Sequence, residues 1–146
     1  MKKTSNILLS VQPQWMEKIL SGEKTLELRK ARPSINPPFT IYLYQTLHGG
    51  AKKTASDGMV VGKCTCSYIR GDVNPANGLV DVIDIKLSCL TPQEVMRYAN
   101  GKIVYWWRLV DVERFTNPRP LSDFTTLQRA PQSYCFIGGE KDAAKS

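Results

Sequence analysis

Apolar and polar residues alternate along much of this chain, and this pattern predicts a fold built mainly from β-strands. The predicted strands are rich in β-branched and aromatic residues, and the segments between them contain glycine, proline or asparagine. They comprise residues 7–11, 24–30, 41–46, 60–69, 104–115 and 133–137. Residues 80–90 also alternate, with Ile83, Ile85 and Leu87 on one side, and predict a seventh strand.

Two short segments have helical signatures instead. In the first, Pro13 suits the first turn of a helix, Trp15 lies on an apolar face expected to join the core, and Gly22 suits a left-handed helix end. In the second, residues 91–94 read Thr-Pro-Gln-Glu, which is a capping box with proline at the first helical position. This helix is expected to end at Asn100, which precedes a glycine.

Together these elements predict a single α+β domain that is mostly β. Six or seven mainly antiparallel strands with two short helices suit a small barrel with the helices at its rim. With 146 residues, the chain is long enough to bury one hydrophobic core. We expect the domain to span residues 1–138, and we expect the polar residues 139–146 to form a disordered tail.

The strand predicted after the first helix has one apolar face and one polar face. Its two leucines would point to the core, whereas Thr25, Glu27 and Arg29 would lie together on the opposite face. Lys24 lies at the mouth of the preceding glycine turn. Such a group of side chains is suited to a small polar or phosphorylated ligand, although a surface ion-pair network would have the same pattern.

This segment is part of a longer resemblance to a known family. The pattern G-x-K-x-x-x-x-R, met by Gly22, Lys24 and Arg29, resembles the hallmark of the ASCH domain, a relative of the PUA RNA-binding fold. The resemblance continues in the same order at residues 7–15, 41–46, 61–64, 105–107, 118–124 and 130–134. It covers nearly the whole chain apart from about the last eight residues and implies a PUA-like pseudo-barrel.

The resemblance also implies activities to be weighed. Some ASCH proteins are amidohydrolases of an acylated cytidine nucleoside, and Lys24 matches their catalytic lysine. Their nucleophilic threonine lies three residues later, where this chain carries Glu27, so that activity is not expected here. Other relatives have been proposed to bind or cleave RNA through a lysine, a tyrosine and a serine. Lys53, Tyr44 and Ser133 match these residues by order.

Lys24 and Glu27 are the candidate catalytic residues. A lysine acts as a general base only when its pKa is lowered, and a neighbouring carboxylate opposes this because it favours the charged ammonium. Binding roles fit these side chains more naturally. Arg29 would contact an anion through two N–H groups, Lys24 would contact a phosphate, and Glu27 would accept a hydrogen bond from a base or sugar.

Positive charge is concentrated in the N-terminal part of the chain. The net charge is +7, and residues 1–53 carry nine Lys/Arg against three Glu. Lys52 and Lys53 lie in a glycine-rich loop, residues 47–58, that is expected to be mobile. An anionic partner, most simply a nucleic acid, would explain this charge, and so would a requirement for solubility.

Several other residues are compatible with either ligand binding or ordinary packing. Trp106 and Trp107 would point to opposite faces of their strand, and one of them, assigned here to Trp107, could stack on a base instead of joining the core. Tyr44 has the same two readings. Gln132 and Ser133 could close a cleft or could simply form a turn before the last strand.

The sequence predicts no metal, no cofactor and no membrane span. The four cysteines form no C-x-x-C motif, and the one histidine, His48, has no evident partner, so we expect buried free thiols and an exposed loop histidine. The apolar run at residues 7–11 is too short for a signal peptide. A cytoplasmic location is therefore expected.

These observations predict an ASCH-type domain that binds RNA, a nucleotide or a nucleoside in a basic cleft. The alternatives are a metal-independent ribonuclease or hydrolase of modified nucleosides that uses Lys24, and a regulatory protein-interaction module with an apolar patch near the tryptophans. The natural ligand and the oligomeric state stay open. The predicted binding residues are Lys24, Thr25, Glu27, Arg29, Tyr44, Lys52, Lys53, Trp107, Gln132 and Ser133.

Overall fold

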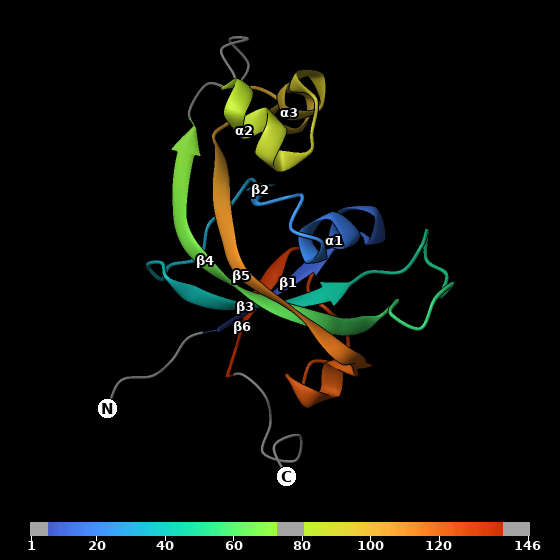
Figure 1. Cartoon of the computed structure of the whole chain (residues 1–146). Helices are drawn as coiled ribbons and strands as arrows, with labels where there is room; N and C mark the ends of the chain where they lie inside the picture. Colours follow the sequence, from blue (N-terminus) through green and yellow to red (C-terminus); the bar gives the residue numbers. More distant parts are fainter. Residues whose placement is uncertain (1–5, 73–80, 139–146) are drawn as a thin grey trace.

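The computed structural model describes residues 6–72 and 81–138, and in these residues it has six strands and three helices (Figure 1). The strands are β1 (Asn6–Val11), β2 (Leu26–Arg29), β3 (Phe39–Gln45), β4 (Met59–Asp72), β5 (Val104–Arg119) and β6 (Tyr134–Ile137). The helices are α1 (Pro13–Leu20), α2 (Val82–Ser88) and α3 (Pro92–Ala99), and a 3-10 turn, η2 (Leu121–Asp123), follows β5. The predicted tail, 139–146, lies outside the described residues.

All six strands belong to one mixed sheet in the order β2-β5-β4-β3-β1-β6. Only the β1–β3 pair is parallel, and the other neighbours are antiparallel. The long strands β4 and β5 shift register at three places along their pairing. Such bulges bend a sheet and increase its twist, and the curvature of β4 and β5 is visible in Figure 1.

A single side chain links the two distant ends of this sheet. Arg29 ends β2, which is one edge of the sheet, yet it donates from Nη2 to the carbonyl oxygen of Ser10 in β1 at 2.9 Å. From Nη1 it donates to Oγ of Ser133, the residue before β6, at 3.1 Å. The sheet therefore curls until its first and last strands approach each other, as the expected pseudo-barrel requires.

The two predicted helices are confirmed together with their end signals. In α1, Pro13 is at the start, Met16 and Ile19 are buried, and Gly22 follows the helix with φ +86°. In α3, the side chain of Thr91 accepts from the amide of Glu94 at 3.1 Å, and the Glu94 carboxylate accepts from the amide of Thr91 at 2.9 Å. This reciprocal pair satisfies two backbone donors that a helix start otherwise leaves open.

The prediction of a strand over residues 80–90 is wrong, because its described part contains the helix α2 and no strand. Asp81 caps the helix by accepting from the amide of Ile83 at 2.7 Å, and Cys89 ends it in the left-handed region with φ 61°. Ile83 is exposed, so the apolar alternation does not reflect a buried face. Ile85 and Leu87 instead pack against the second core cluster, which contains Leu26, Val95 and Trp106.

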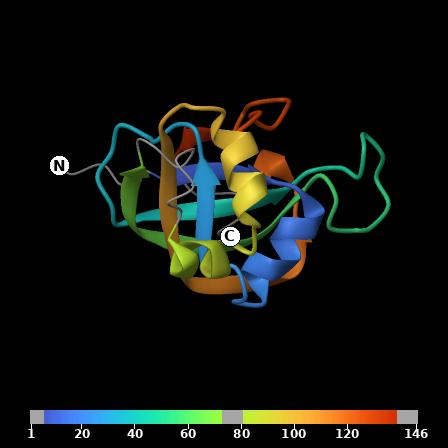
Figure 2. The same cartoon turned by 90° about the horizontal axis from the view of Figure 1, so that it is seen from above.

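The helices α2 and α3 lie at one end of the sheet, whereas α1 lies beside its middle (Figure 1). Figure 2, which looks from above, shows α2 and α3 side by side over the curved strands. The main core cluster, which includes Ile19, Leu43 and Trp107, fills the interior of the curled sheet beside α1. Among residues 6–72 and 81–138, no helix is long and apolar enough to cross a membrane.

Candidate functional site

A cleft of about 810 Å³ opens between the start of α1, the strand β2 and the helix α3. Clefts of a few hundred to 1,000 Å³ are the usual size for small-molecule sites. Its lining residues are Ser10, Val11, Gln12, Gln14, Trp15, Lys24, Glu27, Leu28, Arg29, Thr46, Leu90, Glu94, Arg97, Tyr98 and Gln132. Residues of the segment 24–29 and Gln132, two residues before β6, thus meet at one cavity.

Lys24 forms the floor of the cleft although its side chain is almost wholly buried. Its ammonium donates to the carbonyl oxygen of Ser88 at the end of α2, lies 3.6 Å from Oε1 of Glu27, and lies 5.1 Å from the ring centre of Trp15. Burial lowers the pKa of Lys24, and the attraction of Glu27 opposes this shift without cancelling it. The ammonium is therefore held in place but is easier to deprotonate than a surface lysine.

Glu27 and Arg29 form a second ion pair in the same group. Arg29 donates to Oε2 of Glu27 from both Nε, at 2.9 Å, and Nη2. With the bonds to Ser10 and Ser133, these contacts use four of the five N–H groups of a guanidinium. At most one N–H remains for a ligand, so a bidentate grip by Arg29 would require exchange of one of these contacts.

Two aromatic side chains flank this charged floor. Trp15 of α1 and Tyr98 of α3 both line the cleft, and Tyr98 keeps about a third of its surface exposed. Lys30 lies 4.8 Å from the ring centre of Tyr98. Arg97, which is exposed on the same helix, adds a further cation to the rim. The cleft therefore combines cations with aromatic surfaces, which is the composition of sites that bind nucleotides.

Sequence reasoning missed the residues that α1 and α3 contribute. Trp15 was expected to be core, and it does pack against the main core cluster, but it also lines the cleft. Arg97 and Tyr98 carried no signal in the sequence that pointed to a site. Glu94 was recognised only for its capping role, yet it also lines the cleft.

The structure brings together only part of the predicted binding set. Lys24, Glu27, Arg29 and Gln132 line the cleft, and Ser133 reaches it indirectly through its bond to Arg29. Thr25 does not line it. Thr25 precedes β2, and its backbone pairs with Leu87 and Leu109.

The interpretation of Trp107 as a stacking platform is wrong. Its side chain is fully buried and contacts Phe39 and Tyr134 with ring centres 6.1 and 5.6 Å apart. Tyr44 packs against the third core cluster, around Leu8, and lines no cavity described here. Sequence alternation cannot tell which side of a curled sheet is enclosed, because both sides carry apolar residues.

The loop of residues 47–58 is organised around Asp57, which is fully buried. Its carboxylate accepts from the amides of Lys53 and Thr54 at 2.8 and 2.9 Å and from Nε2 of Gln45 at 2.9 Å, and it lies 2.7 Å from Nδ1 of His48. Burial by itself would raise the pKa of Asp57, but these hydrogen bonds outweigh it and hold the pKa well below its usual range. His48 therefore has a partner, contrary to the expectation from spacing.

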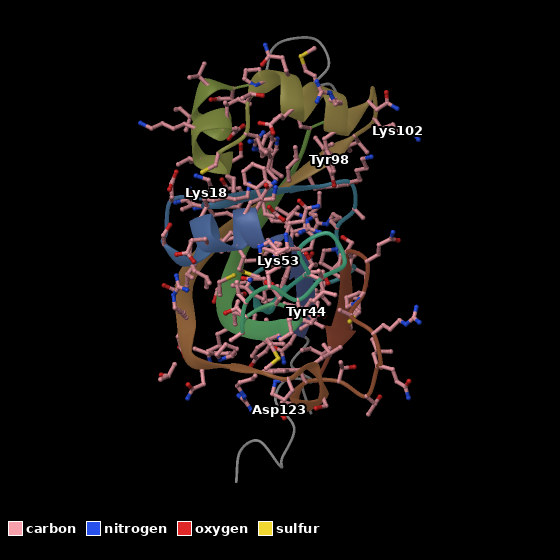
Figure 3. All side chains as sticks on the ribbon, turned by 90° about the vertical axis from the view of Figure 1, so that its right-hand side faces the viewer. Lys18, Tyr44, Lys53, Tyr98, Lys102 and Asp123 are labelled. Atoms are coloured by element: carbon pink, nitrogen blue, oxygen red, sulfur yellow. The ribbon has the colours of Figure 1, made fainter. Side chains whose placement is uncertain are left out.

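Lys52 and Lys53 are exposed on this loop and do not line the cleft. The Lys52 ammonium donates to the carbonyl oxygen of Asp57 at 2.6 Å. Figure 1 shows the loop projecting away from the sheet, and in Figure 3 Lys53 and Tyr44 lie below Tyr98. The predicted basic cleft is thus two neighbouring parts, a charged cleft and a separate basic loop.

Replacing Asp57 by Asn should lower the melting temperature by about 5–10 °C at pH 7, because loss of a buried hydrogen-bond network is among the most destabilising changes. The folded pKa of Asp57 is lowered, so its stabilising effect is complete above pH of about 4 and is lost as the pH falls further. The difference between wild type and Asp57→Asn should therefore shrink from pH 7 to pH 3. Thermal melts across this range provide the measurement, and a constant difference would contradict the assignment.

The cysteines are free, and Cys64 and Cys66 are buried. Burial raises the pKa of both thiols, that of Cys66 to about 12, which makes them poor nucleophiles. Within the described parts of the chain, no group of three or more His, Cys, Asp or Glu side chains could hold a metal ion.

Comparison with models of protein families identifies the family to which this chain belongs. A family model described as the ASCH domain matches residues 9–130. The chain belongs to the ASCH domain family. The match includes α1, β2, α3 and all other cleft-lining residues except Gln132.

Solved structures agree with this assignment. The ASCH protein of Zymomonas mobilis is 21% identical and superposes with a TM-score of 0.71, over 96% of this chain and 90% of that chain. Two variants of that protein, one with tyrosine replaced by phenylalanine and one with serine replaced by alanine, give TM-scores of 0.70 at 21% identity, over 90% of this chain and 88% and 87% of theirs. At this identity the likeness establishes the shared PUA-like fold. No curated protein sequence matches this chain.

Proposed function

We propose that this ASCH domain binds single-stranded RNA, or a nucleotide or nucleoside derived from it, in the cleft between α1, β2 and α3. The observation that carries the proposal is the buried Lys24–Glu27–Arg29 group at the base of a cavity flanked by Trp15 and Tyr98. Cations positioned beside aromatic surfaces suit the two faces of a nucleotide, its phosphate and its base.

The charge balance of the cleft supports an anionic ligand. Glu27 balances the charge of one of its two cationic partners, the buried Lys24 and the half-buried Arg29, so the group keeps a net positive charge when Lys24 is protonated. Arg97 at the rim increases this charge, and Glu94 opposes it. Both carboxylate oxygens of Glu27 already face cations, which makes Glu27 a positioning residue for Lys24 and Arg29 rather than an acceptor for a base.

Tyr98→Ala is expected to weaken binding of a short single-stranded RNA about 5- to 150-fold, which corresponds to about 1–3 kcal/mol for loss of one base–aromatic stack. Fluorescence anisotropy at two salt concentrations measures both this loss and the salt dependence that phosphate contacts produce. Tyr68→Ala is the matched control, because Tyr68 is an exposed tyrosine that lines neither cavity. The proposal would be contradicted if Tyr98→Ala and Tyr68→Ala changed the RNA affinity equally, or if the affinity of the wild-type protein were the same at both salt concentrations.

A second candidate function is hydrolysis of a modified nucleoside by Lys24. The observation in its favour is that burial lowers the pKa of Lys24, which is what a general base needs. The observation against it is Glu27, which favours the charged ammonium and occupies the place of the threonine nucleophile.

We expect the wild-type protein to release the acyl group of an acylated cytidine no faster than the Lys24→Met variant does. Chromatography of the nucleoside after incubation decides this, with Lys52→Met as the control for loss of an unrelated lysine. Rapid release that depends on Lys24 would instead establish the enzyme and point to another hydroxyl as the nucleophile.

A further inference from the structure

A second cavity adjoins the cleft. It has a volume of about 560 Å³ and is lined by Gln12, Pro13, Gln14, Thr46, Leu47, His48, Gly49 and Gly50. Gln12, Gln14 and Thr46 line both cavities. Because the two cavities share these residues, a ligand that fills the cleft can continue past the start of α1 into the second cavity without leaving the surface.

His48 presents a fixed polar edge to this second cavity. Its Nδ1 lies 2.7 Å from the buried carboxylate of Asp57, which three other donors hold in place. The opposite ring nitrogen, Nε2, therefore points away from Asp57, and about a third of the imidazole is exposed. A histidine held in this way keeps one orientation, so its free edge is preorganised for a ligand.

The lining of the second cavity combines polar contacts with an apolar wall, as a nucleoside with its polar sugar and apolar base face requires. Gln12, Gln14, Thr46 and His48 supply two amides, a hydroxyl and an imidazole, and Pro13 and Leu47 supply the apolar surface. The carboxylate of Asp57 is buried, and its charge is satisfied by hydrogen bonds within the loop and to Gln45. Lys52 and Lys53 of the same loop are exposed. The loop that lines the cavity with residues 47–50 thus turns positive charge outward at Lys52 and Lys53, and this charge attracts the phosphates of a strand of nucleotides.

We propose that the second cavity binds the nucleotide adjacent to the one held in the cleft, so that the ligand is a strand of at least two linked nucleotides. This inference rests on the proposed function, since it extends the same binding surface. Thr46, Gln12 and Gln14 lie at the junction, and His48 contacts the second nucleotide. A free mononucleotide would occupy the cleft alone.

The experiment compares five 5′-phosphorylated probes by isothermal titration: the mononucleotides pU and pA, the dinucleotides pUpU and pApA, and the bisphosphate pUp. The dinucleotides are expected to bind at least about tenfold more tightly than the mononucleotides, because the second contact becomes intramolecular. The bisphosphate pUp, which adds a phosphate without a second nucleoside, should fall between them. His48→Ala should weaken dinucleotide binding about fivefold and leave mononucleotide binding within about twofold.

Amide NMR of the wild-type protein provides a readout that needs no variant. Dinucleotides should shift the amides of Gly49 and Gly50, and mononucleotides should not. Equal affinities for all probes with no shift at these glycines would overturn the second subsite while leaving the proposed cleft intact. Failure of every probe to bind would instead overturn the proposed function itself.

Discussion

Glu27→Gln is expected to be the most destabilising substitution among the charged residues of the cleft, at about 3–5 kcal/mol. Glu27 lies between the Lys24 ammonium and the Arg29 guanidinium, and the side chains of Glu27 and Lys24 are less than a tenth exposed. The neutral amide keeps the shape but leaves the buried Lys24 and the half-buried Arg29 without their shared carboxylate. Lys24 then either stays charged without a partner or gives up its proton, and both outcomes cost free energy.

A double-mutant cycle separates this effect from simple loss of packing. Lys24→Met removes one buried charge while Glu27 keeps its pair with Arg29, so it should cost less than Glu27→Gln. The double variant should recover part of the loss, because only Arg29 is then left without a carboxylate. Urea denaturation at pH 7 measures all four proteins. Strictly additive effects would mean that Lys24 and Glu27 are not coupled.

Arg29→Ala is expected to weaken RNA binding by about 1–3 kcal/mol, the range for loss of a charged hydrogen bond, which is about 5- to 150-fold in affinity. Lys52→Ala should weaken it less than about threefold, because its ammonium lies on the loop and not in the cleft. The reason for the Arg29 effect is mainly positional. Without the guanidinium, Glu27 keeps only Lys24, and β2 loses its bonds to Ser10 and Ser133.

Arg29→Lys and Arg114→Ala make this result interpretable. Arg29→Lys keeps the charge but cannot reproduce the fork of bonds, so it should bind nearly as weakly as Arg29→Ala. Arg114 pairs with Glu17 on the exposed surface, and its removal should change only a weak long-range attraction. Circular dichroism confirms folding of each variant before anisotropy is measured. Full affinity in Arg29→Lys would assign Arg29 a purely electrostatic role.

The local signals in the sequence were reliable where a few neighbouring residues decide the conformation. The capping box at Thr91 and Glu94 and the glycine after α1 act within one helical turn, and both were predicted correctly. The alternation at residues 80–90 wrongly predicted a strand where α2 forms. A helix supplies its own backbone hydrogen bonds, and the side chain of Asp81 caps the first turn of α2. A strand there would have needed a neighbour in the sheet that alternation cannot guarantee.

By itself, the sequence determined the family, the mostly β architecture, and the placement of Lys24, Glu27 and Arg29 on one short segment. Only the tertiary structure decided what surrounds them. The curl of the sheet brings Ser10 and Ser133 to Arg29, α2 brings a carbonyl to Lys24, and α3 brings Tyr98 across the cleft. These partners lie many residues away in the chain, and their approach depends on how bulges bend β4 and β5, which no local pattern of residues encodes.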